Sequence, residues 1–314
     1  MSGASFLVIP QWQGSGSSRA MRLIDGAEAV LGDLPVSRTH VVTVPAAAGE
    51  ALGTGVQRYS SLTAIRELAA AEIEVLAAPI VTVGGDCGAD LASVQHAVST
   101  RPGGALALVW FDAHGDLNDV ATSPSGAFHG MVLRALLGDG PDGLASTGSA
   151  VLKPSSIVLA GTRALDEGES AFVAKNGIRV VEPGDFDDPD ALVRAVGASG
   201  ATAVYLHIDL DVLDPAVVDG IGSPEPFGVT TEQLCDAIRA LRARFELAGA
   251  AVTEFAPESA EAAVRDLPVI LRVLGALTSP VAGPRTSGTP VAPVSPDAPS
   301  STASGPQRLS TDAP

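Results

Sequence analysis

Cysteine and positive charge are scarce in this chain, and each shortage narrows the classes of protein to which it can belong. Cys87 and Cys235 are its only two cysteines among 314 residues and form no CxxC motif, which excludes a disulfide framework and favours a reducing compartment, the cytoplasm. Lysine and arginine number 19 against 36 aspartates and glutamates. The resulting net charge of −17 argues against nucleic acid and anionic membranes as partners.

The start of the chain has no long apolar run. The first ten residues, MSGASFLVIP, contain no basic region and only a short apolar stretch, so we expect neither a signal peptide nor a membrane anchor. Hydrophobic residues nevertheless make up 46% of the chain, which is enough for a sizeable core. The length allows one large α/β domain or two small ones.

Short apolar runs alternate with segments of helical periodicity along most of the chain. This alternation predicts a mostly parallel sheet with helices on both faces, in which ligands bind beyond the carboxyl ends of the strands. The predicted strands are Ser5–Ile9, His40–Val44, Ile80–Val83, Ala105–Phe111, Ser156–Ala160, Arg179–Val181, Ala203–Ile208 and Ala250–Thr253. The predicted helices are Arg19–Leu31, Arg58–Ala77, Ala89–Val98, Gly130–Leu137, Asp166–Lys175, Asp190–Val196, Thr231–Leu247 and Ser259–Leu277.

The composition changes near Thr278. Eight of the 23 prolines fall between there and Pro314, mixed with serine, threonine, alanine and glycine, and no hydrophobic period survives. Such a segment lacks the apolar residues needed to offset its conformational entropy. We therefore predict one folded domain over residues 1–278 and a disordered tail over residues 279–314.

The segment VWFDAHGDLN, residues 109–118, is the first candidate site. An apolar strand runs into Asp112, His114 and Asp116, which alternate along the chain. If extended geometry holds to the end of the strand, all three side chains point to one face. A single charged residue there is explained by solvation of the strand end, whereas three potential ligands favour a metal site.

A second apolar strand ends in the same way, at Asp209 and Asp211. Two such strand ends in one α/β chain suit a pair of metal ions, because carboxylates can bridge ions a few ångströms apart. Ligation that is rich in oxygen, with one or two imidazoles, favours ions such as Mn²⁺ over structural zinc.

Five segments together resemble the ureohydrolase superfamily, which includes arginases and agmatinases. They are Gly84-Gly85-Asp86-Cys87, Asp112-Ala113-His114-Gly115-Asp116, Ser125-Gly126-Ala127-Phe128-His129-Gly130, Asp209-Leu210-Asp211 and Thr253-Glu254. The resemblance extends over about residues 5–278, and the set is specific although each motif alone is weak. It implies a three-layer α/β/α sandwich with a mostly parallel sheet of about eight strands. It also implies a hydrolase that uses two divalent ions to activate water for attack on a guanidinium carbon.

The resemblance also implies roles for individual residues. Asp112 and Asp209 would bridge two Mn²⁺ ions, Asp116 would complete the shell of one ion, and His114 with Asp211 that of the other. Three residues would be catalytic: Asp116, His129 and Glu254. His129 would shuttle protons near the leaving amine, and Glu254 would hold the guanidinium by a charge-assisted bond.

Cys87 departs from the superfamily pattern, which usually has histidine at this metal-binding position. A thiolate is a softer ligand than imidazole and must lose its proton to bind. Cys87 would then be a ligand that weakens Mn²⁺ binding or shifts preference toward Zn²⁺ or Fe²⁺. A cysteine at this position also resembles the hydroxyarginine hydrolases within the superfamily. Alternatively, the first site is partly empty and the protein is a slow or catalytically silent relative.

The far end of the substrate decides between the superfamily's activities. Asn118 and Ser125 match positions where arginases bind the α-carboxylate, and Asp166 and Glu169 match residues that bind the α-amino group. Ser223 matches a hydroxyl near the guanidinium. We therefore predict cleavage of L-arginine or Nω-hydroxy-L-arginine to ornithine plus urea or hydroxyurea. An agmatinase or another guanidino-acid hydrolase is the alternative.

Several of these residues have simpler explanations. Asp166 and Glu169 have the spacing of a capping box, and Asn118 and Ser125 could be ordinary loop residues. His207 shares a strand face with Asp209, where a buried structural histidine is favoured over a further metal ligand. Cys235 falls on an apolar helix stripe and is expected in the core. Superfamily members assemble as trimers or hexamers, so the resemblance implies a homo-oligomer.

Overall fold

A computed structural model describes residues 3–188 and 190–280. Its centre is a sheet of eight strands in the order β2-β1-β3-β8-β7-β4-β5-β6, and every neighbouring pair is parallel. The strands are β1 Ser5–Ile9, β2 Thr39–Val41, β3 Ile80–Gly84, β4 Leu106–Phe111, β5 Ile157–Ala160, β6 Arg179–Val181, β7 Ala203–Asp209 and β8 Glu246–Thr253.

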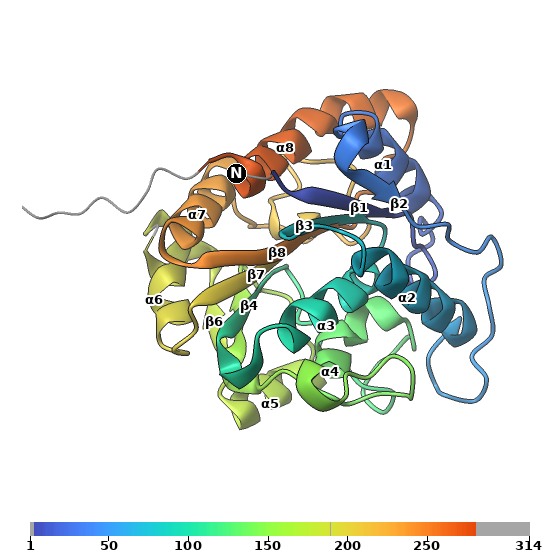
Figure 1. Ribbon diagram of the computed structural model, residues 1–314, viewed down its shortest axis with the longest axis horizontal. Coiled ribbons are helices and arrows are strands. Elements are labelled where there is room, and N and C mark those ends of the chain that lie inside the picture. Colours follow the sequence, from blue (N-terminus) through green and yellow to red (C-terminus); the bar gives the residue numbers. More distant parts are fainter. Residues whose placement is uncertain (1–2, 189, 281–314) are drawn as a thin grey trace, which may run out of the picture. The chain divides into compact units, whose positions relative to one another are not determined.

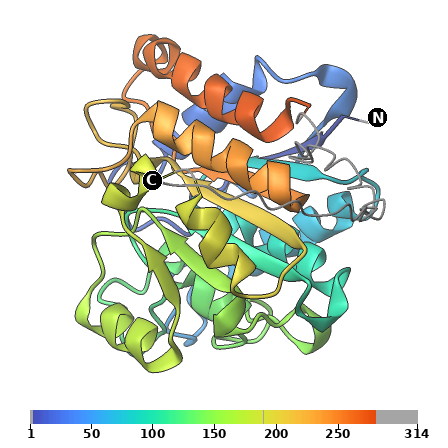
Figure 2. The ribbon, with the colours of Figure 1, turned by 90° about the vertical axis from the view of Figure 1, so that its left-hand side faces the viewer.

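Helices cover both faces of this sheet (Figure 1). One face is covered by α2, α3, α4 and α5, and the other by α1, α6, α7 and α8. Figure 2 shows α7 and α8 lying side by side. The helices are α1 Arg22–Leu31, α2 Tyr59–Ile73, α3 Leu91–Ser99, α4 Val132–Leu136, α5 Glu167–Asn176, α6 Ala191–Gly197, α7 Thr231–Arg244 and α8 Ala260–Thr278. The predicted three-layer α/β/α fold is therefore confirmed.

The central strands are rich in apolar residues, as expected where both faces of a strand are buried. In β4, Val109 and Phe111 pack into the core beneath α7 and α8, whereas Leu108 and Trp110 pack into the core beneath α3 and α4. Alternation of side chains thus divides one continuous apolar run between two cores. This packing fixes which residue of each strand reaches the carboxyl edge of the sheet.

The predicted helix Thr231–Leu247 was too long. In the structure α7 ends at Arg244, and β8 begins only two residues later at Glu246. Glu246 and Leu247 pair with the start of β7, so hydrogen bonds of the sheet override the helical pattern of the sequence. The predicted tail, 279–314, lies almost entirely outside the described residues. The predicted boundary coincides with the end of α8 at Thr278.

Among the residues that the structure describes, no helix combines the length and the apolar character needed to cross a membrane.

Candidate active site

Four adjacent strands supply the candidate site. The strands β3, β8, β7 and β4 are neighbours in the sheet. Asp209 is the last residue of β7, and Cys87, Glu254 and Asp112 follow the carboxyl ends of β3, β8 and β4. These residues are up to 167 positions apart in sequence, yet Cys87 and Glu254 are in direct contact. Parallel strands bring their carboxyl ends to one edge, which explains the convergence.

The residues converge by turns and not by extended geometry, so that part of the sequence prediction was wrong. β4 ends at Phe111, and Asp116 has a left-handed φ of 50°. Asp112 Oδ1 accepts a hydrogen bond from the His114 amide at 2.6 Å, and Asp209 Oδ1 accepts one from the Asp211 amide at 2.8 Å. Each aspartate thereby bends the chain over itself, as in an Asx turn.

Hydrogen bonds tie the two aspartate turns together. His114 Nδ1 lies 2.9 Å from Asp211 Oδ2 and 3.4 Å from Asp112 Oδ1. The Ala113 amide donates to Asp211 Oδ1 at 2.9 Å, and the Trp110 indole donates to Asp112 Oδ2 at 2.9 Å. The potential ligand atoms of Asp112, His114 and Asp211 all lie within 4.8 Å of one another.

The buried carboxylates carry more negative charge than the described residues around them neutralise. Burial, followed by the charge of Asp211, raises the pKa of Asp112 to about 7. Burial and neighbouring carboxylates also raise the pKa values of Asp116 and Asp209 well above their usual range. Asp211 is the exception: burial opposes ionisation, but hydrogen bonding and the charge of His114 lower its pKa.

This donor set fits divalent cations. Asp116 Oδ2 is buried and has no hydrogen-bond partner within residues 3–188 and 190–280. An unpartnered buried carboxylate oxygen is costly unless a cation or water binds it. Hard oxygen donors and one imidazole at one sheet edge are the ligands that ions such as Mn²⁺ take in proteins. The residues that could hold the ions include those predicted, Asp112, His114, Asp116, Asp209 and Asp211, with Cys87 beside them.

Cys87 lies against this cluster but does not line the open pocket. Its Sγ is 3.1 Å from Asp209 Oδ2 and 3.9 Å from Glu254 Oε1, and the residue is buried. Burial, followed by the charge of Asp209, raises the pKa of the thiol well above its usual value. In the metal-free protein the thiol therefore donates its proton toward Asp209, and metal binding would require deprotonation.

Asp86 positions Cys87, a role that the sequence analysis did not assign. Its carboxylate accepts hydrogen bonds from Gln11 Nε2 and the Gly14 amide, each at 2.8 Å, and from the Gly88 amide at 2.9 Å. A β-carbon at Gly85 would lie 1.5 Å from the Gln11 carbonyl oxygen, so only glycine allows the two loops to meet. The sequence signal for Asp86 was its place in the Gly-Gly-Asp-Cys segment.

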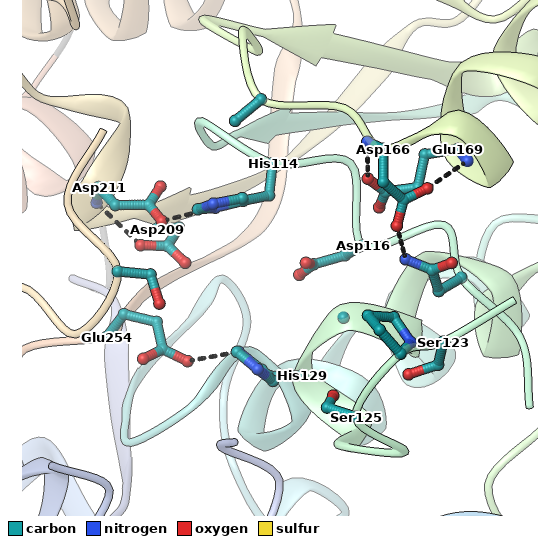
Figure 3. A pocket seen from close by; sticks show the side chains of 15 residues that line it. His114, Asp116, Ser123, Ser125, His129, Asp166, Glu169, Asp209, Asp211 and Glu254 are labelled. Atoms are coloured by element: carbon teal, nitrogen blue, oxygen red, sulfur yellow. Dashed lines mark hydrogen bonds and ion pairs between the residues drawn. The ribbon is translucent and has the colours of Figure 1, made fainter. Parts of the chain in front are cut away.

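A pocket opens above the carboxylate cluster (Figure 3). Asp209, Asp211 and His114 form one wall, Asp166 and Glu169 the opposite wall, and Asp116 points into the space between them. Except for Cys87 and Asp112, every predicted site residue lines this pocket. The lining residues from that set are His114, Asp116, Asn118, Ser125, His129, Asp166, Glu169, Asp209, Asp211, Ser223 and Glu254.

Glu254 and His129 face each other across the pocket floor. Glu254 has a left-handed φ of 64°, and its Oε1 lies 3.6 Å from His129 Nδ1. Burial alone would lower the pKa of His129, but the interaction with Glu254 and the charge of Asp86 raise it overall. A protonated imidazole beside the pocket is a suitable proton donor.

The opposite wall is built by a capping box, as the simpler explanation predicted. The Glu169 amide donates to Asp166 Oδ1 at 2.9 Å, and the Asp166 amide donates to Glu169 Oε2 at 3.1 Å. Asn118 Nδ2 donates to Asp166 Oδ2 at 2.7 Å, and Ser125 Oγ accepts from the Ala127 amide at 3.1 Å. All four residues therefore have structural roles, and their predicted contacts with substrate remain predictions.

Arg163 is a second residue that the sequence analysis missed. Its guanidinium donates to the carbonyl oxygens of Asp211 and Glu225, each at 2.8 Å, and to that of Pro226 at 2.9 Å. The side chain thus joins the metal-side turn to the loop that bears Ser223. Cys235 lies in the apolar core, as predicted.

Comparison with known proteins agrees with this picture. The arginase of Staphylococcus aureus (strain MRSA252) is 38% identical over 166 residues, which are 51% of this chain and 54% of that protein. The arginase of Bacillus caldovelox is 35% identical over 220 residues, 64% of this chain and 68% of that protein. The crystal structure of arginase from Bacillus cereus has a TM-score of 0.72 and 25% identity, and the match covers 88% of this chain and 98% of that one.

Fold and site define an α/β protein with a carboxylate-rich pocket at the carboxyl edge of a parallel sheet. The model of the arginase family matches residues 16–271. The chain belongs to the arginase family, which confirms the resemblance read from the five motifs. The alignment nevertheless spans only about half the length of the Staphylococcus relatives, 54% for the strain named above.

Proposed function

We propose that this protein is a metal-dependent amidinohydrolase that cleaves the guanidino group of L-arginine or Nω-hydroxy-L-arginine. The products would be ornithine plus urea or hydroxyurea. Membership of the arginase family supports the reaction class. The observation that carries the proposal is the pocket itself, which has a buried set of metal-ligating groups on one wall and two further carboxylates on the other.

The proposed metal centre comprises two divalent ions. Cys87 and Asp116 would hold one ion and His114 and Asp211 the other, with Asp112 and Asp209 completing the set of ligands. When bound, such ions supply an activated water and stabilise developing negative charge. We propose Mn²⁺, with Zn²⁺ or Fe²⁺ as alternatives because Cys87 adds a soft ligand.

The remaining groups act on the substrate. Glu254 accepts hydrogen bonds from the guanidinium, and the two opposite charges favour each other in this partly enclosed site. His129, held protonated by Glu254, donates a proton to the leaving amine. Neither role requires movement of the backbone, because both side chains already face the pocket (Figure 3).

The opposite wall would select the amino-acid end of the substrate. Asp166 and Glu169 would accept hydrogen bonds from the α-ammonium, while Asn118 and Ser125 would donate to the α-carboxylate. Asn118 Nδ2 gives one of its two hydrogens to Asp166, so the other remains for the α-carboxylate. Ser223 would lie near the guanidinium.

A substrate panel with metal counting tests the proposal. Purified protein loaded with Mn²⁺ is assayed with L-arginine, Nω-hydroxy-L-arginine, agmatine and 4-guanidinobutanoate, and bound metal is counted in the same samples. We expect turnover of one or both α-amino acids with two ions bound. Faster turnover of agmatine or 4-guanidinobutanoate would contradict the proposed substrate class. Absence of turnover with fewer than two ions bound would favour the silent-relative hypothesis.

The Glu254→Gln variant isolates the guanidinium contact. Loss of a hydrogen bond between charged partners costs about 1.5–3 kcal/mol, so we expect kcat/KM to fall by about 10- to 150-fold with metal content retained. The matched control is Glu258→Gln, which makes the same change at an exposed side chain on the same loop. Equal effects of the two substitutions would contradict the assigned role of Glu254.

Two further expectations, cytoplasmic location and assembly into trimers or hexamers, rest on the sequence and the family resemblance and remain predictions.

A further inference from the structure

His207 occupies a position in the floor of the site that its burial alone does not explain. It lies on β7 two residues before Asp209 and is fully buried. Its ring stacks on the Trp110 ring, with centroids 3.4 Å apart and planes 5° from parallel. This stacking fixes the plane of the imidazole, so the ring nitrogens can point only to the groups in that plane.

Asp90 contacts one nitrogen of the His207 ring. Its Oδ2 lies 3.0 Å from His207 Nδ1, and its Oδ1 accepts a hydrogen bond from the Tyr205 hydroxyl. Nδ1 is thereby engaged with Asp90, and Nε2 is the ring nitrogen left for a metal ion. A carboxylate that orients the far nitrogen is the usual arrangement around metal-binding histidines.

Two of the proposed metal ligands, Cys87 and Asp112, lie close to the His207 ring. A ring nitrogen of His207, the Cys87 sulfur and a carboxylate oxygen of Asp112 all lie within 4.8 Å of one another. The Thr253 hydroxyl lies 3.3 Å from Nε2 and 3.7 Å from the Cys87 sulfur. It can donate instead to the Ile208 carbonyl at 3.4 Å, which would free Nε2 for a metal ion.

We propose that His207 Nε2 is a ligand of the metal ion on the Cys87 side, together with Cys87 and Asp112. Cys87 occupies the position where the superfamily usually has histidine. His207 would supply an imidazole to the same ion from strand β7. The resulting sulfur, nitrogen and oxygen donor set is softer than a carboxylate set and suits Zn²⁺ or Fe²⁺. The inference rests on the proposed metal centre and is independent of which guanidino compound is the substrate.

The chain's five histidines make a direct test practical. Protein labelled with ¹⁵N-histidine is titrated with Zn²⁺, which is diamagnetic, and the Nε2 and Nδ1 resonances are followed by NMR without substrate. We expect the Nε2 resonance of His207 to shift on saturation, with its Nδ1 proton retained. The His207→Gln variant assigns the signal, and substitutions at the other four histidines assign it by elimination if that variant does not fold.

The possible outcomes separate this inference from the metal centre itself. Movement of the His114 signal with no change at His207 would overturn the His207 assignment and leave the metal centre standing. If neither signal moves, no metal enters the site and both proposals fail. A shifted His207 signal that persists in Cys87→Ser, together with weaker Zn²⁺ binding, would support ligation by both residues.

A second test acts through Asp90, which we infer to be a positioning residue. Asp90→Asn weakens the bond that orients His207, and loss of such outer partners lowers metal affinity by about 10- to 100-fold. The control is Glu72→Gln, because Glu72 makes the same kind of contact with His40, at 3.1 Å, on the surface. Unchanged Zn²⁺ affinity in Asp90→Asn, measured by competition with a chelator, would contradict the role.

Discussion

Asp166 offers a way to separate substrate recognition from helix capping. In the structure it caps α5 and accepts a hydrogen bond from Asn118 Nδ2 at 2.7 Å. Asparagine is as good an N-cap as aspartate, so Asp166→Asn keeps the cap while removing the charge. The unpartnered Oδ1 of Asn118 can accept from the new amide after its own amide flips. We therefore expect the free energy of unfolding to change by less than about 1 kcal/mol.

The effect on the substrate should be larger than the effect on stability. A hydrogen bond from an α-ammonium to a carboxylate contributes about 1.5–3 kcal/mol, and the exposure of Asp166 to solvent favours the lower end. About 1.5 kcal/mol corresponds to a rise of about tenfold in KM for arginine. Because the ammonium is held equally in the ground and transition states, kcat should stay nearly constant.

The assay compares arginine with 5-guanidinopentanoate, which lacks the α-amino group. We expect Asp166→Asn to raise KM for arginine and to leave KM for 5-guanidinopentanoate unchanged. Asp185→Asn serves as the control, because Asp185 belongs to a capping box outside the pocket, with Glu182. An unchanged KM for arginine, or an equal rise for both substrates, would refute the assignment of Asp166 to the ammonium.

Three further predictions test the site and the fold. Cys87→His should raise Mn²⁺ affinity in metal titrations, and unchanged Mn²⁺ stoichiometry would count against Cys87 as a ligand. The pKa of Asp112 is raised from 3.8 to about 7 in the folded metal-free protein. Between pH 3.8 and about 7 the folded state therefore binds more protons than the unfolded state. Thermal stability of the metal-free protein should therefore fall as pH rises through that range, while stabilisation by added metal should grow; a metal-free Tm that rises with pH would contradict this. Gly26→Ala places a β-carbon 1.9 Å from a backbone carbonyl oxygen and should lower the free energy of unfolding by about 1–3 kcal/mol in urea denaturation. Gly32→Ala, where the nearest atom is 3.5 Å away, should cost nothing and is the control.

Strand positions were the part of the fold that local sequence predicted best. The bounds of β1 and β6 agree with prediction, because each apolar run is closed by residues that cannot continue a strand. The start of β8 was predicted four residues too late, since Glu246 and Leu247 continue the amphipathic pattern of α7, whereas its end at Thr253 agrees with prediction. Their assignment to the sheet depends on pairing with β7, which no local pattern contains.

In the candidate site, too, the sequence predicted some features and missed others. The candidate metal ligands could be named from the sequence, since five short motifs in order along the chain carry the family resemblance. Their convergence was predicted from extended strand ends, whereas the structure achieves it through aspartates that bind amides two residues ahead. Asp86 and Arg163 were missed because they bind groups of loops that are distant in the sequence, such as the Gly14 amide and the Asp211 carbonyl.

The sequence by itself determined the family, the parallel α/β architecture and the identity of the residues that can bind metal. These properties follow from local periodicity and from residue types at short spacings, which are visible in one dimension. The tertiary structure alone decided that Cys87, Asp112 and His207 lie close together, and that Asp90 contacts the His207 ring. Those contacts form because strands that are neighbours in the sheet bring together residues that are far apart in the sequence. Asp90 and His207, for example, are 117 residues apart.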